Sequence, residues 1–277
     1  MTPNPQLYPL EINAKTKEPF LRLRKHKNII LTPPRWEDAE GLFSSGNDSR
    51  VNEWLTVPVP YPMGTFSCLF KTPLKASGLV EAANKFLSRI VPAATKFFED
   101  MESFKDDSTL KVVGDFPVRA IREVQEDGTD IYIGDIGISR CGYGELMDLV
   151  NGVDLENGSE RKKFNDSLDL GDPSILWSIG GVYKEASYLY LTKILKDFLM
   201  PSHHRQGIMT DAVDTLLHEW AIPRMNVRHV MVAIFVGNEG SIKVFSRNGF
   251  KMTNTIENYK EVRGKMRGLH VMEWRYS

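Results

Sequence analysis

Residues 203–250 constrain the fold of this chain more than any other stretch, because they carry loop, helix and strand signals in a fixed order. The run HHRQGIM, from His203 to Met209, holds a glycine and leads into a segment whose apolar residues recur at spacings of three and four: Ile208, Met209, Ala212, Val213, Leu216, Leu217 and Trp220. This spacing predicts a helix with one apolar face. We expect Pro223 to lie just beyond its end.

A strand and a second helix are predicted directly after this helix. Branched apolar residues recur at every second position, as in a half-buried strand: Val230, Val232, Ile234 and Val236. The polar block from Asn238 to Ser241 then opens a short helix, and Gly249 is placed to end it in a left-handed conformation. Residues 252–256 and 269–274 predict two further strands joined by a basic connection.

The loop that precedes the first helix predicts an anion site. The first four backbone N–H groups of a helix lack partners inside the helix, and the helix dipole adds positive potential at the same end. A second polar block, residues 238–241, follows one strand later and suggests a long phosphorylated ligand held at two points. Acyl-coenzyme A fits that description.

In this order, these residues resemble the GNAT superfamily of acetyl-coenzyme A-dependent N-acetyltransferases, and most of all the branch that acetylates ribosomal-protein N-termini, with its fungal relatives. The pyrophosphate loop of the family reads Arg or Gln, two residues, Gly, one residue, then Gly or Ala. Residues 204–209 occupy that loop here; Gly207 matches it strictly, whereas His204 and Met209 depart from it. Further residues stand at the family spacing downstream: Asn238, Ser241, Phe245, Gly249 and Phe250.

The resemblance implies an α/β (α+β) GNAT fold, in which a twisted, mixed and mostly antiparallel sheet is flanked by helices on both faces. Residues 29–38 resemble the first strand of the family running into its first helix, and residues 116–138 predict a hairpin around Asp127-Gly128. We expect a single domain over residues 20–277. Residues 1–19 are expected to be an N-terminal extension that is partly disordered.

Two stretches look added to the core of the family. Residues 144–172 are rich in acidic side chains and are expected to be either a solvated surface loop or an acidic flap that attracts a cationic amine. Residues 181–196 interrupt a strand that the family uses ahead of its pyrophosphate loop. This second stretch is either a genuine surface insertion or a translated intron, and sequencing of the messenger RNA separates the two.

Composition restricts the partners. The chain has 35 basic and 36 acidic residues, so its charge demands neither a nucleic acid nor an anionic membrane. Cys68 and Cys141 give no disulfide framework and no metal-ligand spacing. Neither a membrane-spanning apolar run nor a signal peptide is evident, so we expect a cytoplasmic or nuclear protein.

The resemblance implies acetyl-coenzyme A as cosubstrate. Residues of the loop and of the second block are expected to bind it: His204, Arg205, Gln206, Gly207, Ile208, Met209, Thr210, Asn238 and Phe245. Arg205 is expected to donate a charge-assisted hydrogen bond to phosphate. Asn238 either binds cofactor amides or is an ordinary turn asparagine. A basic cluster either meets the 3′-phosphate or is simply solvated: Lys260, Arg263, Lys265 and Arg267.

Metal binding is not expected. His203 and His204 are neighbours in sequence and therefore point in different directions, and no third ligand is spaced to join them. The predicted reaction needs no metal.

Ser241 is the candidate catalytic residue. In the branch that this chain resembles, the matching serine lies beside the thiol, whereas many other members use a tyrosine at the position of Phe245, which has no proton to give. Ser241 either donates a hydrogen bond to the departing sulfur or caps the following helix. Four carboxylates are candidates for a general base, each with an ordinary surface or capping role as the alternative: Asp48, Glu53, Asp135 and Asp197. Proton removal through water also stays open.

Three functional classes follow. The first is an N-acetyltransferase that transfers an acetyl group from acetyl-coenzyme A to a primary amine, on a protein N-terminus or a small molecule. The second is a catalytically weak acyl-coenzyme A binding module. The third, a phosphate-loop nucleotide hydrolase, is disfavoured because no Gly-Lys-Ser/Thr follows the loop glycine.

Overall fold

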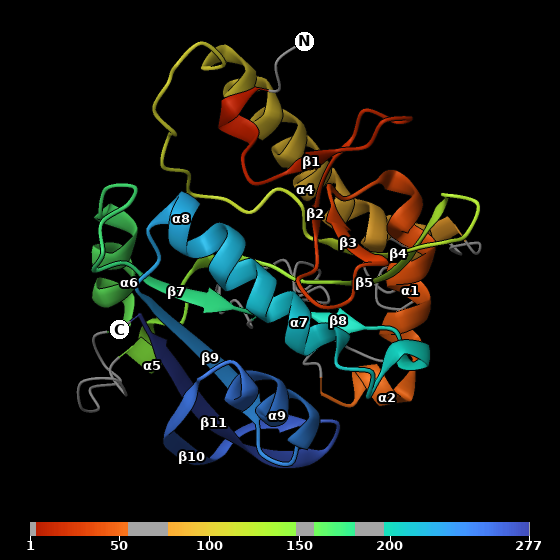
Figure 1. Ribbon diagram of the computed structural model, residues 1–277. Coiled ribbons are helices and arrows are strands. Elements are labelled where there is room, and N and C mark those ends of the chain that lie inside the picture. Colours follow the sequence, from red (N-terminus) through yellow and green to blue (C-terminus); the bar gives the residue numbers. More distant parts are fainter. Residues whose placement is uncertain (1–3, 55–76, 148–157, 181–196, 277) are drawn as a thin grey trace.

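A computed structural model describes residues 4–54, 77–147, 158–180 and 197–276 (Figure 1). One sheet has the strand order β1 (Glu11–Ile12), β2 (Pro19–Arg22), β3 (Ile29–Thr32), β4 (Ala120–Val124), β5 (Asp130–Asp135) and β8 (Phe198–Leu199). The other has the order β10 (Lys251–Val262), β11 (Lys265–Arg275), β9 (His229–Phe235), β7 (Leu176–Ile179) and β6 (Ile138–Arg140). Neighbouring strands are antiparallel except β7 and β9, which are parallel.

Strand β9 shows why helices cover both faces of its sheet. Val230, Val232 and Ile234 pack in one buried cluster with the apolar face of α7 (Ile208–Thr215). The intervening Met231 and Phe235 pack in a second cluster with α5 (Gly144–Met147). Because successive side chains of a strand point to opposite faces, one continuously apolar strand supports both layers. The predicted fold class, a mostly antiparallel mixed sheet with helices on both faces, is confirmed.

The helix that begins at Ile208 does not end before Pro223, so that prediction is wrong. After α7 the chain forms a π-helical stretch, Leu216–Ala221, and continues as α8 (Ile222–Met225). Pro223 lies inside this continuous helix, directly after the π-helical stretch. The end comes at Asn226, whose φ of 53° is left-handed.

The N-terminal residues take part in the fold. Residues 5–7 form a short 3-10 helix, and β1 pairs with β2. The Gln6 side chain is fully buried and donates hydrogen bonds to the carbonyls of Asp107 and Thr109 at 3.1 and 3.0 Å. Arg224 of α8 donates to the Gln6 carbonyl at 2.7 Å. Part of the expected N-terminal extension thus contacts the rest of the chain, and residues 1–3 lie outside the described part.

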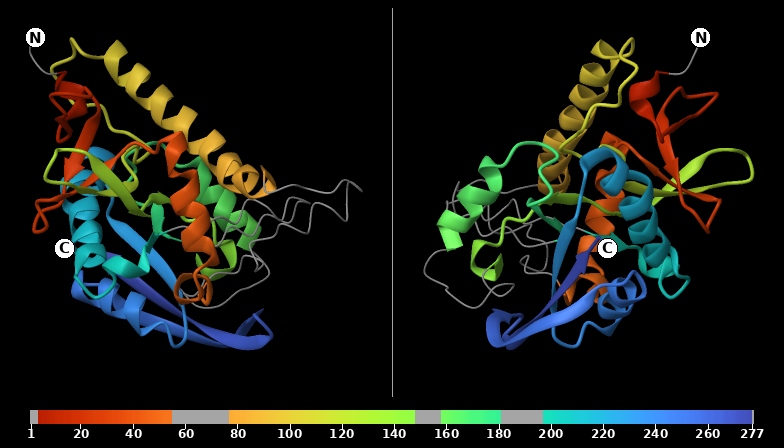
Figure 2. Two further views of the ribbon diagram at one scale, coloured as in Figure 1. Left: turned by 90° about the vertical axis from the view of Figure 1, so that its right-hand side faces the viewer. Right: turned by 60° about the vertical axis from the view of Figure 1, so that its left-hand side comes forward.

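Helices α1 (Ala39–Asn47), α2 (Ser49–Asn52) and α4 (Ser77–Ser103) cover the first sheet. Figure 2 shows α4 as a long helix beside α1, at the outer edge of the molecule. Its Phe86 and Leu87 pack with Leu42 of α1, and Phe97 and Met101 reach the main core. The sequence did not lead us to expect this helix.

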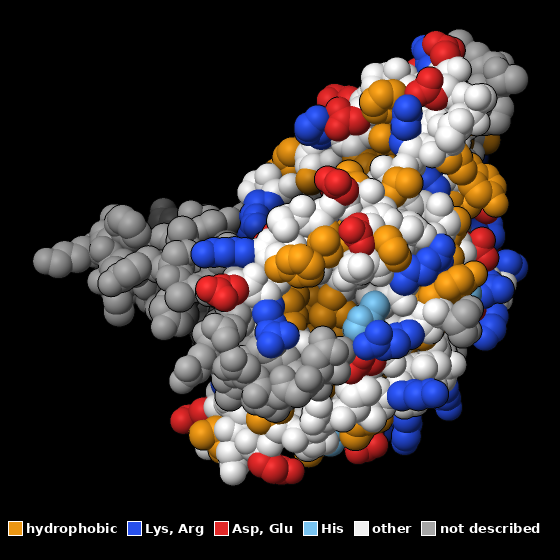
Figure 3. All heavy atoms as spheres, turned by 90° about the vertical axis from the view of Figure 1, so that its left-hand side faces the viewer, with side chains coloured by type: hydrophobic (Ala, Val, Ile, Leu, Met, Phe, Trp, Pro, Cys, Tyr) orange, Lys and Arg blue, Asp and Glu red, His pale blue; other side chains and the backbone are white. Residues whose placement is uncertain are grey.

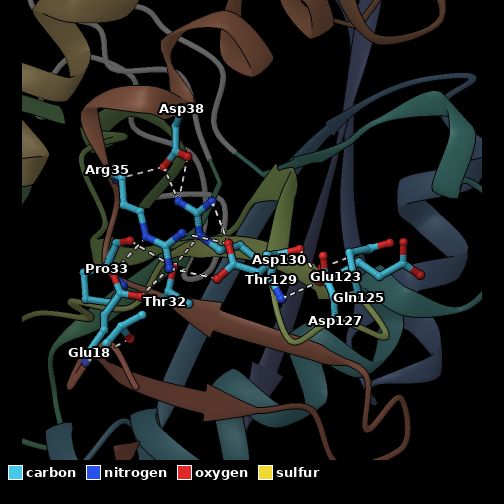
Figure 4. Close-up of polar contacts among 12 residues, drawn as sticks. Glu18, Thr32, Pro33, Arg35, Asp38, Glu123, Gln125, Asp127, Thr129 and Asp130 are labelled. Atoms are coloured by element: carbon cyan, nitrogen blue, oxygen red, sulfur yellow. Dashed lines mark hydrogen bonds and ion pairs between the residues drawn. The ribbon is translucent and has the colours of Figure 1, made fainter. Parts of the chain in front are cut away.

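A buried ion network joins α1 to the first sheet (Figure 4). Arg122 of β4 donates to both carboxylate oxygens of Asp38 at 2.6 and 2.8 Å and to the Thr32 hydroxyl at 2.7 Å. Arg35 binds Asp130 at 2.7 Å on the same side. A buried ion pair is tolerated only when its hydrogen bonds are satisfied, as they are here. The network therefore ties the start of α1, at Asp38, to strand β4.

The described part of the acidic stretch 144–172 is helical. Besides α5 it contains α6 (Gly158–Ser167), which packs on α5; residues 148–157 lie outside the described part. The Asn165 side chain is buried, accepts from the backbone N–H of Leu176 at 2.8 Å and donates to its carbonyl at 2.9 Å. The described part is therefore helical where we expected a loop, and the acidic flap stays a prediction.

The two C-terminal strands are longer than predicted. We expected a basic connection between residues 257 and 268, but β10 and β11 pair up to a tight turn at Arg263-Gly264. Both turn residues have positive φ, 56° and 69°, which suits the twist of a two-residue hairpin turn.

Candidate functional site

The candidate site begins at the loop before α7, in which two residues have left-handed backbone conformations. Strand β8 leads through a 3-10 turn, Pro201–His203, into the stretch that ends at Gly207. Gly207 has a φ of 81° and is the N-cap residue of α7, and Arg205 has a φ of 63°. Glycine adopts this conformation without steric cost. The loop glycine singled out in the sequence therefore sets the direction in which α7 starts.

The backbone of this loop is rich in unused donors. The N–H groups of residues 205–210 donate no hydrogen bond to the part of the chain that the structure describes. Most helices satisfy some of these groups with a side chain of the N-cap residue, but Gly207 has none. The start of α7 can therefore bind an anion through backbone donors alone.

The loop side chains take different roles. The ring of His204 lies 2.8 Å from the Leu199 carbonyl through Nε2, and the Gln206 amide donates to the Ser202 carbonyl at 3.1 Å. Both side chains thus brace the loop itself. Arg205 is exposed and reaches toward solvent, whereas Ile208 is buried in the core and Met209 packs against its edge.

The second block starts helix α9 (Glu239–Arg247). Asn238 is its N-cap residue, and Oδ1 of Asn238 accepts from the backbone N–H of Ser241 at 3.2 Å. Asn238 thus fills the turn role that the sequence left open. Ser241 is the capped residue and not the cap. Its half-buried hydroxyl makes no hydrogen bond to any described residue.

Helix α9 lies against α7 and brings the two blocks together. The Asn248 side chain donates to the carbonyl of Thr210 at 3.1 Å. Phe245 is 8% exposed, and its ring meets that of Phe250 edge to face at 5.0 Å. Gly249 has a φ of 83°, which confirms the predicted left-handed end of this helix. The burial of Phe245 leaves little of its ring for a ligand.

Strands β7 and β8 pair with the same continuous stretch of chain, residues 130–140, and in the same register. Ile179 of β7 pairs with Ile138, and Phe198 of β8 pairs with Asp135. Two residues separate Asp135 from Ile138, and two separate Ile179 from Phe198 once residues 181–196 are skipped. The two pairings would therefore belong to a single uninterrupted strand if that segment were absent.

The chain leaves and re-enters this strand at one point. A Cβ atom on Gly180 would lie 2.6 Å from Oδ2 of Asp197. Oδ1 of Asp197 accepts from the backbone N–H of Gly137 at 2.8 Å. Gly180 and Asp197 both have left-handed φ, 70° and 51°, so the backbone turns out of the sheet on each side. Residues 181–196 themselves lie outside the described part.

The four candidate bases are engaged in other contacts. Asp48 is the N-cap of α2 and binds Arg50, which lowers the pKa of Asp48 to about 2. Asp135 forms a two-pronged ion pair with Arg119, and Glu53 pairs with Arg267 at 3.2 Å. Asp197 accepts the strand hydrogen bond described above. The lowered pKa of Asp48 makes that carboxylate a weak base at neutral pH.

Two arginines of the basic cluster contact residues at the end of α2. Arg263 donates to the carbonyl of Asn52 at 3.0 Å, and Arg267 stacks over the Trp54 ring at 4.5 Å. A Cβ atom on Gly237 would lie 3.5 Å from the same tryptophan ring. The hairpin β10–β11 thus ties α2 to the turn that precedes Asn238.

The two loop histidines face separate partners. Nδ1 of His203 lies 2.8 Å from the Ser202 hydroxyl and its Nε2 lies 3.4 Å from Glu123, whereas His204 contacts Leu199. Across the described residues, no group of three or more His, Cys, Asp or Glu side chains could hold a metal ion. No helix there is both long enough and apolar enough to cross a membrane.

Charges of both signs are mixed on the surface. Figure 3 shows one face of the molecule, where basic, acidic and hydrophobic side chains are interspersed. This distribution agrees with the near-equal numbers of acidic and basic residues.

Sequence reasoning missed two residues of the site. His26, in the turn between β2 and β3, contacts both the loop and the helix that follows it, through the Gln206 carbonyl and Asp211. Asp211 stands in the first turn of α7, where a carboxylate also suits the helix dipole. Nothing in the local pattern around His26 signals this contact, because its partners lie 180 or more positions away.

One protein-family model matches part of this chain. Residues 194–251 match the model of the acetyltransferase (GNAT) domain. The match spans β8, the loop, α7 to α8, β9 and α9, and it confirms the predicted enzyme class, an acyltransferase. No curated protein sequence matches the chain.

Solved structures with a similar arrangement include several acetyltransferases. An acetyltransferase of the GNAT family from Bacillus anthracis is 10% identical, with 92% of this chain and 98% of that chain covered and a TM-score of 0.49. Mycobacterium smegmatis RimJ, in complex with CoA-disulfide, is 13% identical, with 92% and 85% covered and a TM-score of 0.46. Spermidine N-acetyltransferase from Vibrio cholerae, in complex with CoA and spermine, is 10% identical, with 90% and 95% covered and a TM-score of 0.45.

Proposed function

We propose that this chain is an N-acetyltransferase that moves an acetyl group from acetyl-coenzyme A to a primary amine. The observation that carries the proposal is the run of unused backbone N–H groups at residues 205–210, at the start of α7 and inside the matched segment. A diphosphate is the ligand for which such a row of donors is suited. Isothermal calorimetry with coenzyme A tests it: we expect saturable binding, and an absence of binding heat contradicts the proposal.

Ser241 supports the chemical step in this proposal. Attack of a neutral amine on the thioester carbon forms the amide and breaks the carbon–sulfur bond, so the departing thiolate needs a proton or a hydrogen bond. The Ser241 hydroxyl is half-buried and uncommitted among the described residues, on the helix that packs against α7. Asn238 fixes the Ser241 backbone through its cap, so we propose a supporting role for Asn238 in place of a direct contact with cofactor amides.

The acceptor is proposed to be an α-amine or another weakly basic amine. A lysine amine with a pKa of about 10.4 is almost wholly protonated at neutral pH, while an α-amine near about 8 needs far less help from a base. The candidate bases Asp48, Asp135 and Glu53 are paired with arginines. This favours a protein N-terminus as acceptor, as in the branch that acetylates ribosomal-protein N-termini. Thiol release measured with peptides that have a free or a blocked N-terminus tests the choice.

A catalytically weak acyl-coenzyme A binding module is the second candidate, because the strand ahead of the loop is interrupted after Ile179. Affinity for acetyl-coenzyme A without thiol release from any amine, over a panel of peptides and polyamines, supports this candidate. Turnover with one amine excludes it.

We further propose that residues 20–277 form one domain and that residues 181–196 are an addition to it. The shared register of β7 and β8 supports the addition. When residues 181–196 are skipped, the two strands pair with residues 130–140 as one strand would, with no residue extra or missing. A variant that lacks residues 181–196 is therefore expected to fold and to bind coenzyme A at least as well as the full chain. Loss of the folded state in that variant contradicts the addition. Messenger RNA that lacks the segment identifies it as a translated intron.

A further inference from the structure

The turn between β2 and β3 is docked on the first turns of α7. The backbone N–H groups of Lys25 and His26 donate to Oδ2 of Asp211 at 2.9 and 2.7 Å. The N–H of Arg24 donates to the hydroxyl of Thr215 at 3.1 Å. Asp211 and Thr215 are 1% and 0% exposed. The turn is therefore held in place by buried side chains of the helix whose start we propose to bind diphosphate.

The His26 ring extends this contact to the loop. Nδ1 lies 2.8 Å from Oδ2 of Asp211, and Nε2 lies 3.0 Å from the carbonyl oxygen of Gln206. Cε1 of the same ring would lie 3.7 Å from a Cβ atom on Gly207. The imidazole therefore lies against the peptide bond that joins Gln206 to Gly207.

Both contacts of the ring require a proton from it. A carbonyl oxygen accepts only, and an ionised carboxylate accepts only, whereas a neutral imidazole carries a single N–H group. Two backbone N–H groups already donate to Oδ2 of Asp211, an arrangement that suits the ionised carboxylate. Both ring contacts are therefore satisfied together by the doubly protonated, positively charged imidazolium of His26.

The contact with Gln206 also orients the donor of the next residue. The C=O and N–H groups of a planar trans peptide point in opposite directions. Because the Gln206 carbonyl points at His26, the N–H of Gly207 points away from His26. That N–H belongs to the row of groups without partners at residues 205–210.

We propose that His26 is a positioning residue for the proposed diphosphate site, in its imidazolium form. It holds the peptide between Gln206 and Gly207 so that its N–H faces the ligand, and it adds a positive charge beside the loop. The inference rests on the proposed function of the loop. It predicts that affinity for the diphosphate is highest at low pH and falls as pH rises through the range of about 5 to 8, in which histidine side chains lose their proton.

Other charged groups surround the ring and need controls. On its own turn stand Arg24, Lys25 and Lys27, and Arg24 is paired with Asp214 and Glu219 of the helix. Asp211 faces the ring from α7. Arg205 is in the loop. Arginine and lysine keep their charge over this pH range, so they contribute to affinity without giving it the predicted slope.

The test uses the full chain and 3′-dephospho-coenzyme A, whose diphosphate has no phosphate monoester that titrates near neutral pH. Its dissociation constant is measured by calorimetry from about pH 6 to about pH 8.5. We expect the wild-type affinity to fall with rising pH. His26→Gln keeps one donor but cannot be charged, so its affinity should be lower and should fall less steeply with pH, the remaining slope coming from His203 and His204 of the loop. His26→Ala should raise the dissociation constant about tenfold at the acidic end.

His218→Ala is the matched control. His218 pairs with Asp214 at 3.1 Å on the π-helical stretch after α7 and makes no contact with the loop among the described residues. This variant should keep both the wild-type affinity and its slope. A wild-type slope that persists in His26→Gln and His26→Ala, with unchanged affinity, overturns the role of His26 while leaving the proposed function intact. A wild-type chain that does not bind the probe at any pH overturns both.

Discussion

Helices α7 and α9 begin in opposite ways, although both follow a polar block and pack against each other. Gly207 begins α7 without a side chain, and the backbone N–H groups of residues 205–210 stay without partners in the described structure. Asn238 begins α9 and caps the N–H of Ser241 with its own side chain. The contrast teaches that, among the described residues, the start of α7 offers a longer row of backbone donors to a ligand than the start of α9. The second helix start fixes one of its own residues, Ser241, in place.

Removal of the Ser241 hydroxyl should have the largest effect on activity. If α9 serves to present this hydroxyl to the departing thiolate, Ser241→Ala should lower turnover about 10- to 100-fold, with a much smaller change in affinity for acetyl-coenzyme A. Steady-state thiol release and calorimetry separate the two quantities. Ser246→Ala, an exposed serine on the same helix, is the control. Wild-type turnover in Ser241→Ala would remove α9 from the chemistry.

A methyl group on Gly207 should have the next largest effect, on binding. The left-handed φ of 81° costs an L residue about 1–2 kcal/mol, and relief of that strain rotates the donors of the loop. We expect Gly207→Ala to raise the dissociation constant of coenzyme A about tenfold.

Gly249→Ala provides the matched control for this prediction. Its φ of 83° imposes a similar strain, and the nearest contact of the added Cβ atom, 3.7 Å, is the same distance as at Gly207. Gly249 ends α9 and offers no donor to the ligand. Both variants should lose similar thermal stability, but only Gly207→Ala should lose affinity. Equal losses of affinity would show that the difference between the two helix ends is irrelevant to binding.

Removal of the cap on α9 should have the smallest effect, on stability. Asn238→Ala loses the hydrogen bond to Ser241 and is expected to lower the free energy of unfolding by about 1 kcal/mol. Asn238→Asp keeps an acceptor at the same position and should retain most of the stability. Denaturant unfolding measures both. A large loss of coenzyme A affinity in Asn238→Asp would instead support direct binding of the cofactor by Asn238.

Local patterns in the sequence predicted one part of the molecule well. The helix from Ile208, the strand around Val232, the short helix after Asn238 and the left-handed Gly249 all appear in the structure. Each depends on periodicity or on a residue with a special backbone preference, and both are properties of neighbouring residues. The glycine at the start of α7 was found for the same reason.

Predictions failed where distant contacts decide the structure. The helix passes through Pro223 because a π-helical stretch precedes it and because Arg224 is anchored on the N-terminal segment at Gln6. Helix α4, with Pro92 inside it, packs lengthwise on α1 and on the core, and no start or stop signal marked it. His26 joins the site through Asp211, which lies 185 positions further along the chain. Such pairs leave no periodic trace in a single sequence.

The central claim is that backbone N–H groups at the start of α7 hold a diphosphate. Amide resonances of the isotope-labelled chain, recorded while coenzyme A is added, test this most directly. We expect the N–H signals of Gly207, Ile208 and Thr210 to shift most strongly, with the N–H of Ser241 less affected because Asn238 already holds it. Saturable binding with unchanged signals at residues 205–210 would contradict the account.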